Sequence, residues 1–321
     1  MKKTVGIIGA NGYTGSELIR LLAFHPHVTL SFLYSRSNSG TRISDLYPDL
    51  TTVCEMVLTD KPEEVDILFL CLPHKESQNW LTQNPVNDET LVIDLGNDFR
   101  LEGNFGNRDF IYGLPEINKK QLAGAKSIAN PGCFATAIQL ALLPLAEKEA
   151  LNEVFTTGIT GSTGAGQSLQ ATTHFTWRND NVSAYKTLTH QHVDEILQQL
   201  ISFNNKEVTL NFVPWRGDFA RGIFTSSTMK TDLEMEEIEQ LYQDFYAEEP
   251  FVTVSRKAVD LKQVVNTNRC VIQIEKSGNV AVIHSAIDNL LKGASGQAVQ
   301  NMNLAMNWEE NAGLNLKPIA F

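Results

Sequence analysis

The chain has 321 residues and a formal net charge of −11, with 42% hydrophobic and 20% charged residues. This length predicts two domains or one large one, and the composition is ordinary for a soluble globular protein. The acidic balance excludes nucleic acid and membrane surfaces as partners because both need clustered lysine and arginine, and no apolar run approaches the roughly 20 residues that span a bilayer.

In chain order, the first half alternates strand and helix patterns. A glycine-rich turn at residues 9–15 is followed by a helix pattern at 16–24 whose apolar residues share one face. Short apolar runs predict strands at residues 4–8, 28–34, 66–72 and 91–95. Continuous apolar strands separated by helices are typical of a parallel sheet covered on both faces. The sequence therefore predicts a Rossmann-type, doubly wound α/β domain.

The pattern changes near residue 130. Helices are expected at residues 134–150, 192–203, 233–246 and 294–306. The strands expected between them are at residues 154–160, 208–213, 222–228, 271–275 and 280–287. Several of these strands alternate apolar and polar residues, which indicates a sheet with one face in water. We predict a second, α+β domain with a mixed sheet.

The turn at residues 9–15 reads Gly-Ala-Asn-Gly-Tyr-Thr-Gly. Glycines permit close approach of a pyrophosphate, and the following helix presents free N–H groups and the positive end of its dipole. Because the turn joins a predicted strand to a predicted helix, it predicts a dinucleotide site rather than a purely structural turn. The residues expected to hold the dinucleotide here are Gly9, Asn11, Gly12, Tyr13, Thr14 and Gly15.

The end of the second strand distinguishes the two nicotinamide cofactors. NAD sites usually place an acidic residue there to bind the ribose hydroxyl, whereas this strand ends in Ser35, Arg36 and Ser37. A guanidinium and two hydroxyl groups suit a 2′-phosphate. We therefore predict NADP(H), with a solvated Arg36 as the alternative.

Cys133 lies within Asn-Pro-Gly-Cys-Phe-Ala-Thr, directly before the long helix pattern. A helix N-terminus stabilises the thiolate, the reactive form of cysteine. Such a thiolate attacks an acyl phosphate to give a thioester, which a hydride then reduces to an aldehyde. The other cysteines, Cys54, Cys71 and Cys270, fall in apparent strands and are interpreted as small buried residues. Their wide spacing indicates reduced thiols in a cytoplasmic protein, without a disulfide framework or a zinc site.

His190 and His192 flank Gln191 just before a helix pattern. On an extended or turn segment the two imidazoles project near the same place, so one can act as general acid/base and the other bind an anion. A His-x-His pair also suggests a metal, but no third or fourth ligand is evident, and we expect none. The remaining alternative is a pair of surface histidines without a catalytic role.

Taken together, these motifs resemble the semialdehyde dehydrogenase family, and within it the N-acetyl-γ-glutamyl-phosphate reductases of arginine biosynthesis. The resemblance spans essentially the whole chain. The motifs that carry it are GANGYTG at Gly9, the Ser35–Ser37 strand end, LPHKES at Leu72, VIDLGNDFRL at Val92, YGLPEIN at Tyr112, NPGCFAT at Asn130, GSTGAG at Gly161, HQHVDEI at His190 and DNLLKGASGQAVQNMN at Asp288.

The resemblance implies that Cys133 forms the thioester and that the acid/base is His190 or His192. It implies that Arg100 faces the substrate phosphate and that Ser162 and Arg221 contact the substrate. It also implies that Pro73, Ser162, Gly164 and Asn289 contact NADP(H). The cofactor domain is then discontinuous, 1–132 with 289–321, and residues 133–288 form a catalytic domain through which a homodimer or homotetramer assembles.

Two positions depart from the family pattern. Gln167 and Gln191 stand where the family commonly has arginine. The thiol and the imidazoles remain, so the expected reaction is reduction of an acyl phosphate. The charge around the substrate differs, however, which leaves the N-acyl group open between acetyl, succinyl and another acyl or carrier-linked group.

Three alternatives remain from the sequence. The first is the same chemistry on aspartyl phosphate, and the second is an aldehyde dehydrogenase that uses water in place of phosphate. The third is a non-catalytic NADP-binding sensor that keeps the glycine turn. Retention of Cys133, Arg100 and the two histidines favours an enzyme.

Overall fold

The computed structural model describes residues 1–319, and their contacts divide the chain into two compact units. The first unit comprises Met1–Gly132 and Ala294–Asn315, and the second comprises Cys133–Gly293 and the described residues from Leu316 onward. The expected return to the cofactor domain at residue 289 therefore differs from the observed one at Ala294. Asp288 and Asn289 remain with the second unit because their side chains bond to Arg221 and Gly222.

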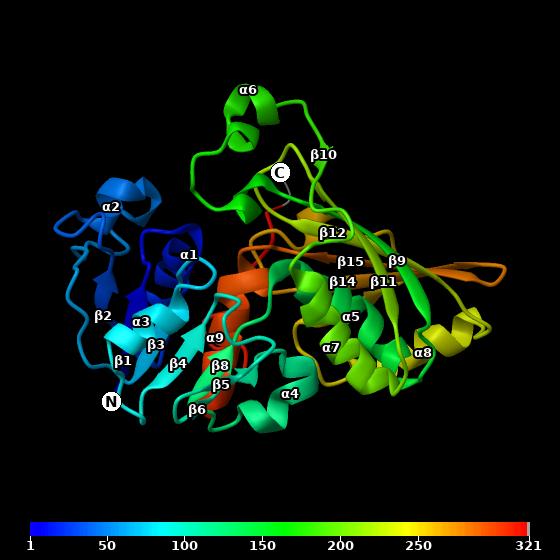
Figure 1. The fold of residues 1–321 in the computed structure, drawn as a ribbon, viewed down its shortest axis with the longest axis horizontal. Helices are drawn as coiled ribbons and strands as arrows, with labels where there is room; N and C mark the ends of the chain where they lie inside the picture. Colours follow the sequence, from blue (N-terminus) through cyan, green and yellow to red (C-terminus); the bar gives the residue numbers. More distant parts are fainter. Residues whose placement is uncertain (320–321) are drawn as a thin grey trace. The chain divides into compact units, whose positions relative to one another are not determined.

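A six-stranded parallel sheet forms the centre of the first unit, in the order β2-β1-β3-β4-β8-β7 (Figure 1). Its strands are β1 (Lys3–Ile8), β2 (Val28–Tyr34), β3 (Ile67–Leu70), β4 (Leu91–Asp94), β7 (Ile111–Tyr112) and β8 (Ser127–Ala129). Its helices are α1 (Tyr13–Leu22), α2 (Ile43–Leu46), α3 (Ser77–Gln83), α4 (Pro115–Leu122) and α9 (Gly296–Ala305), with a short hairpin of β5 (Asn104–Phe105) and β6 (Arg108–Asp109). The parallel, doubly wound sheet predicted from the sequence is confirmed.

Helices cover both faces of this sheet. Trp80 of α3 joins one core cluster with Leu68 and Leu70, alternate residues of β3. Alternate residues of a strand point to one face, so α3 lies on that face. Helix α9 contacts β4, α1 and α4, and it brings a segment from the end of the chain into the first unit. The central strands β3 and β4 and the neighbouring β8 are short and wholly buried, as expected for a sheet covered on both faces.

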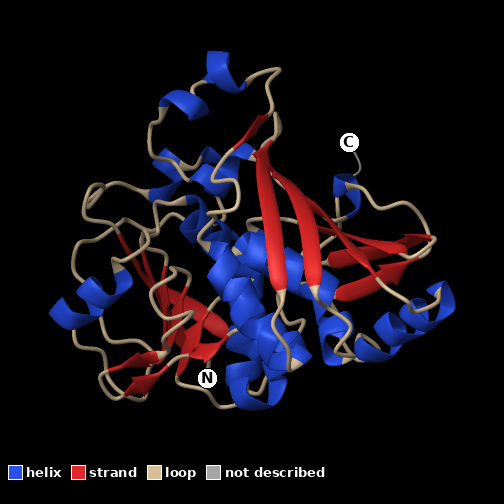
Figure 2. Ribbon diagram, turned by 45° about the vertical axis from the view of Figure 1, so that its right-hand side comes forward, coloured by secondary structure: helices blue, strands red, loops and turns tan. Residues whose placement is uncertain are grey.

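A seven-stranded mixed sheet forms the second unit, in the order β10-β11-β9-β12-β15-β14-β13 (Figure 2). Its strands are β9 (Glu153–Thr160), β10 (Ser183–Ala184), β11 (Thr209–Arg216), β12 (Ile223–Lys230), β13 (Val252–Ser255), β14 (Cys270–Ser277) and β15 (Val280–Ile287). Its helices are α5 (Cys133–Glu147), α6 (Phe175–Arg178), α7 (His192–Asn204) and α8 (Met235–Phe245). The predicted α+β unit with a mixed sheet is confirmed.

Helix α5 is the core of the second unit. Residues Phe134 to Ala146 are all buried, because α5 packs against α7 and α8 on its sides and against β12, β14 and β15 below. A helix that is apolar all round has to be enclosed in this way. Strands β9 and β12 alternate buried and more exposed residues, so α5, α7 and α8 cover one face of the sheet and leave the other open.

Candidate functional site

The glycine turn connects β1 to α1 in the first unit, as predicted. Gly9 has φ of +80°, and a Cβ there would lie 2.3 Å from the carbonyl oxygen of Cys71. A Cβ on Gly15 would lie 2.6 Å from the carbonyl oxygen of Gly9. The turn therefore tolerates no side chain at either position. The backbone geometry of the turn therefore explains why glycine is needed at Gly9 and at Gly15.

The same turn suits a pyrophosphate. Helix α1 begins after Gly12 with no side-chain cap and no acidic residue in its first turn, so its N–H groups and dipole favour an anion. The segment from Cys71 to Pro73 follows β3 at the same carboxyl edge of the sheet, where open α/β sheets bind nucleotides. Asn11 and Thr14 use backbone carbonyls to hold Tyr47 and Ser295, which fixes the turn from two sides.

The residues after β2 suit a 2′-phosphate. Arg36 is exposed, and its Nε donates to the hydroxyl of Tyr34 at 3.0 Å, a bond that raises the pKa of the guanidinium. The Oγ of Ser35 is buried and has no hydrogen-bond partner within residues 1–319. A fixed cation, an available hydroxyl and the lack of an acidic residue from Ser35 to Ser37 fit NADP(H) better than NAD(H).

Arg100 is buried in the first unit, after β4. Its Nε donates to the carbonyl of Asn130 at 2.9 Å and its Nη2 to the carbonyl of Leu95 at 3.0 Å. The nearby carboxyl of Asp94 is fully buried, and this burial raises its pKa to about 6 despite hydrogen bonds from Ser77 and Gly96. The guanidinium is therefore oriented by the backbone, and its charge acts to lower the pKa that burial raises at Asp94.

Cys133 is the first residue of α5, as the sequence predicts. The helix dipole at this position favours the thiolate. Gly293 lies against it, since a Cβ on Gly293 would be 2.8 Å from the Cβ of Cys133. Cys270 begins β14, but Cys54 lies in a loop and Cys71 follows β3, so their predicted strand placement is wrong. No disulfide joins the four cysteines, all of which lie within residues 1–319.

The two histidines are brought together at the start of α7. Their ring centroids are 4.6 Å apart, and both side chains are buried. The backbone N–H of His192 donates to Nδ1 of His190 at 3.2 Å. The ring of His190 is enclosed by Phe134, which follows Cys133, and by Phe212 of β11. The imidazole pair therefore lies in the second unit beside Phe134, the residue after the half-buried Cys133.

The loop after β9 is fixed by Asn289. The backbone N–H of Ser162 donates to the carbonyl of Phe219, and the Thr163 hydroxyl donates to that of Ala220. The amide of Asn289 donates to Thr163 Oγ1 at 3.0 Å and accepts from the N–H of Gly222 at 2.7 Å. The predicted site residues Ser162, Gly164 and Asn289 thus belong to one connected structure.

Arg221 forms a two-point ion pair with the fully buried carboxylate of Asp288, with N–O distances of 3.1 and 3.3 Å. The same carboxylate accepts N–H groups from Leu290, Leu291 and Asn266. Arg221 therefore neutralises the charge of Asp288, which holds the turn before Gly293. The sequence did not indicate this structural ion pair.

Three residues near the histidines were not predicted. Tyr185 lies 5.7 Å from His190 between ring centroids, and Arg216 lies over the Tyr185 ring at 4.5 Å. Burial and, second, the neighbouring Cys133 raise the pKa of Tyr185 to about 12. Nη1 of Arg178 donates to the backbone carbonyl of Arg216 at 2.8 Å. No motif marks these residues, because the pairing of β10 with β11 brings them together.

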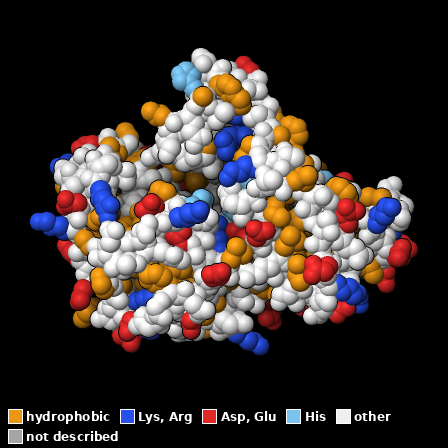
Figure 3. All heavy atoms as spheres, viewed as in Figure 1, with side chains coloured by type: hydrophobic (Ala, Val, Ile, Leu, Met, Phe, Trp, Pro, Cys, Tyr) orange, Lys and Arg blue, Asp and Glu red, His pale blue; other side chains and the backbone are white. Residues whose placement is uncertain are grey.

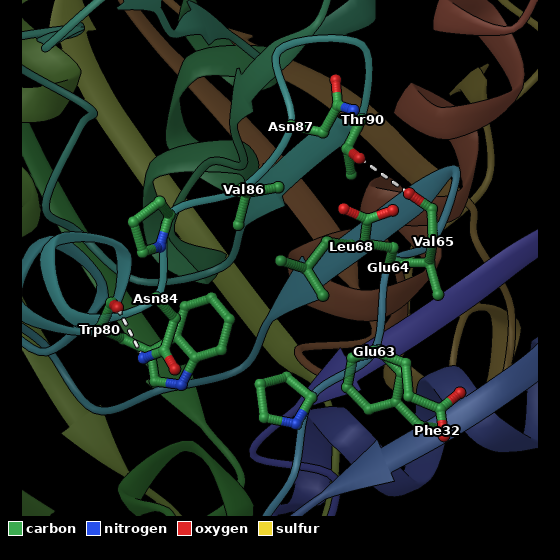
Figure 4. A pocket seen from close by; sticks show the side chains of 12 residues that line it. Phe32, Glu63, Glu64, Val65, Leu68, Trp80, Asn84, Val86, Asn87 and Thr90 are labelled. Atoms are coloured by element: carbon green, nitrogen blue, oxygen red, sulfur yellow. Dashed lines mark hydrogen bonds between the residues drawn. The ribbon is translucent and has the colours of Figure 1, made fainter.

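A shallow pocket of about 140 Å³ lies elsewhere in the first unit (Figure 4). Its walls come from residues 62–65, before β3, and residues 84–87 and 90, before β4, together with Phe32, Leu68 and Trp80. It therefore lies at the amino ends of these strands, the edge opposite the glycine turn. None of the predicted site residues lines it.

The described residues contain no group of three His, Cys, Asp or Glu side chains that could hold a metal ion. None of their helices is long and apolar enough to cross a bilayer. On the face shown in Figure 3, lysine and arginine side chains are interspersed with aspartate and glutamate rather than gathered into a basic patch.

Comparison with known proteins finds two matching family models and similar proteins over nearly the whole chain. The model of the semialdehyde dehydrogenase NAD binding domain matches residues 4–125, and that of the semialdehyde dehydrogenase dimerisation domain matches residues 133–289. Proteins named N-acetyl-gamma-glutamyl-phosphate reductase are similar over nearly the full length. One from Flavobacterium johnsoniae is 51% identical over 99% of both chains, and one from Phocaeicola vulgatus is 50% identical over 98% of this chain and 99% of the relative.

Solved structures share the fold at low identity. Aspartate semialdehyde dehydrogenase II from Vibrio cholerae has a TM-score of 0.72 at 16% identity and covers 96% of this chain and 99% of its own. Aspartate semialdehyde dehydrogenase from Candida albicans, solved with NADP, has a TM-score of 0.69 at 17% identity and covers 97% of this chain and all of its own. The chain belongs to the semialdehyde dehydrogenase family, in the group of the N-acetyl-gamma-glutamyl-phosphate reductases.

Proposed function

We propose that this chain uses NADPH to reduce N-acetyl-γ-glutamyl phosphate to N-acetylglutamate semialdehyde and inorganic phosphate, a step of arginine biosynthesis in the cytoplasm. The observation that carries the proposal is Cys133, the first residue of a buried helix, in the same unit as the buried pair His190 and His192. Relatives with this reductase name at about half identity support the substrate.

The chemistry begins at the thiol. The thiolate of Cys133 attacks the γ-carbonyl carbon, and the C–O bond to phosphate breaks, which leaves a thioester on the cysteine. NADPH, when bound, would supply the hydride that reduces this thioester. A histidine takes the thiol proton at the start, gives one to the oxygen of the resulting thiohemiacetal, and takes it back as the aldehyde leaves and the thiolate returns.

The reactants are held by the residues expected from the sequence. Gly9, Gly12 and the start of α1 bind the pyrophosphate of NADP(H), and Ser35, Arg36 and Ser37 bind its 2′-phosphate. The remaining cofactor contacts are Asn11, Tyr13, Thr14, Gly15, Pro73, Ser162, Gly164 and Asn289. Arg100 binds the phosphoryl group of the substrate by two parallel hydrogen bonds, which a guanidinium provides and an ammonium does not.

The test is NADP⁺ reduction in the reverse direction, with N-acetylglutamate semialdehyde and with or without inorganic phosphate. We expect turnover only with phosphate, and a loss of at least 1,000-fold in the variant Cys133→Ala, because the covalent route is removed. The control is Cys270→Ala, which removes a buried thiol of the same unit. Turnover without phosphate would favour a water-using dehydrogenase, and equal rates for both variants would exclude Cys133 as the nucleophile.

The oligomer is also part of the proposal. The open face of the second unit's sheet carries apolar side chains, among them Phe155, and the segment after β9 exposes Leu169, Phe175 and Leu188. Exposed apolar side chains in such number mark interaction surfaces. The match of residues 133–289 to a dimerisation domain supports a homodimer or homotetramer built through this face.

A further inference from the structure

Two arginines of the second unit lie side by side. Arg178 ends α6 and is almost completely buried, with Nη1 donating to the carbonyl of Arg216 at 2.8 Å and to that of Asn181 at 3.1 Å. Its Nη2 donates to the hydroxyl of Ser183 at 3.3 Å. Arg216 ends β11, pairs with Ser183 across the sheet, and places its guanidinium over the ring of Tyr185. The Arg178 side chain is therefore fixed by backbone carbonyls, and the Arg216 side chain lies against the ring of Tyr185.

The positive charge of this pair is not balanced by an ion pair. Within residues 1–319, neither Arg178 nor Arg216 forms a salt bridge, and the Nε of each is buried without a hydrogen-bond partner. Burial and, second, the charge of Arg216 lower the pKa of Arg178, while Asp218 opposes this. Buried donors without acceptors and adjacent like charges both cost free energy, and a bound anion relieves both costs.

This charge lies beside the reacting groups. Tyr185, under the Arg216 guanidinium, is close enough to Cys133 for the thiol to affect its pKa, and its ring contacts that of His190. The segment that follows Arg216 supplies the carbonyls that hold Ser162 and Thr163. An anionic group bound to Arg216 is therefore expected to belong to the same substrate molecule that reacts at Cys133.

We propose that Arg216, supported by Arg178, binds a carboxylate of the acylated amino-acid substrate and thereby selects it. This inference rests on the proposed function for the identity of the substrate. A guanidinium held over an aromatic ring presents its edge in a fixed orientation, which suits the planar carboxylate. The carboxylate has two sources, the α-carboxylate of the glutamyl unit or one at the end of the N-acyl group, as in N-succinyl.

The kinetic test compares N-acetylglutamate semialdehyde with N-succinylglutamate semialdehyde for wild type, Arg216→Gln and Arg216→Lys. We expect Arg216→Gln to raise KM at least tenfold with kcat changed less than threefold, and Arg216→Lys to recover part of the loss. A higher KM for both substrates would show that Arg216 binds the α-carboxylate. A higher KM for the succinyl substrate alone would show that it binds the carboxylate of the N-acyl group. The control is Arg256→Gln, an exposed arginine of the same unit.

A binding test without turnover separates this inference from the proposed function. N-acetyl-L-norvaline carries the α-carboxylate and N-succinyl-L-norvaline carries both, and neither has a group that reacts with Cys133. Calorimetry on the full chain with NADP⁺ should give a dissociation constant at least fivefold weaker for Arg216→Gln. Unchanged KM and unchanged affinity for both ligands would overturn the proposal. Weakened binding without wild-type turnover would instead keep the anion site and reject the reductase.

Discussion

The hydrogen bond between His192 and His190 separates the roles of the two imidazoles. Nδ1 of His190 accepts the backbone N–H of His192, so the neutral ring of His190 carries its proton on Nε2. A nitrogen that already carries a proton cannot take one from the thiol. We therefore propose that His192 transfers the proton and that His190 is a positioning residue.

Substitution by asparagine tests this assignment. His192→Asn should lower kcat/KM by about 100-fold or more, the usual contribution of general acid–base catalysis, and remove the corresponding limb of the pH–rate profile. His190→Asn offers an acceptor oxygen in place of Nδ1, so its loss should stay within about tenfold and its pH profile should keep that limb. The opposite order of the two losses would assign the proton transfer to His190.

Gly293 is the residue that limits the space of the nucleophile. In Gly293→Ala the new methyl group meets the Cβ of Cys133 at 2.8 Å, so the start of α5 has to shift. We expect a loss of stability of about 1–3 kcal/mol and a fall in turnover, because reacting atoms lose their alignment. Thermal melting and steady-state rates measure the two effects.

The control for this variant is Gly278→Ala. Gly278 lies in the turn between β14 and β15, has φ of +58° and open space around it, so alanine costs backbone strain only. It should lower the melting temperature and leave turnover unchanged. A Gly293→Ala variant that behaves in the same way would show that Gly293 does not position the thiol.

At the scale of elements, the end of β4 carries a carboxyl whose ionisation opposes folding. Burial raises the pKa of Asp94 to about 6, above its ordinary value of 3.8. The folded state therefore binds a proton that the unfolded state has already lost between these two values. The free energy by which the ionisation of Asp94 destabilises the folded state grows as the pH rises from about 4 to 6 and is constant above pH 6.

Asp94→Asn removes this term and keeps the acceptor for Ser77. We expect the variant to be more stable than wild type at pH 7.5 by up to about 3 kcal/mol, with the difference shrinking towards pH 4. Urea unfolding at several pH values measures it. Lower stability of the variant at every pH would show that the charge of Asp94 is needed in the fold.

Asp66 provides the control of opposite sign. Partial burial acts to raise its pKa, but hydrogen bonds from Lys3 and Thr4 outweigh this and lower the pKa. Its contribution is therefore present at neutral pH and lost as the pH falls below its ordinary value. Asp66→Asn should be less stable than wild type at pH 7.5, with the difference closing in acid.

Elements with strong periodicity were predictable, and elements set by tertiary contacts were not. The strands β1, β2, β9 and β15 and the helix α5 fall within a few residues of their predicted positions, because their apolar patterns are continuous. The two-residue strands β7 and β10 carry no such pattern. The segment Leu291–Ser295, expected as helix only from residue 294, is π-helical and contains Gly293, which lies against Cys133.

The site shows the same division. Cys133, the histidines and the glycine turn were identified because each combines a chemical group with a local structural signal. Tyr185 and Arg216 were not, since they converge only when β10 pairs with β11. The ion pair between Arg221 and Asp288 could not be predicted either, because the two residues are distant in the sequence.

At the scale of the whole molecule, the open face of the second unit's sheet determines the assembly we propose. Phe155 of β9, Thr228 of β12 and Val282 of β15 form one row across three neighbouring strands on this face. Helices cover the opposite face, so this row is available to a second copy of the chain. An apolar row of this kind associates through the hydrophobic effect, which a buried charge opposes.

The double variant Phe155→Glu with Val282→Glu places two carboxylates in this row. We expect it to be monomeric at micromolar concentration, where wild type is a dimer or tetramer by light scattering after gel filtration. The control is Phe24→Glu, a more exposed phenylalanine of the first unit, which should leave the mass unchanged. Circular dichroism identifies variants that fail to fold. A folded double variant with the wild-type mass would place the subunit contact on a different surface, such as the segment that exposes Leu169 and Phe175.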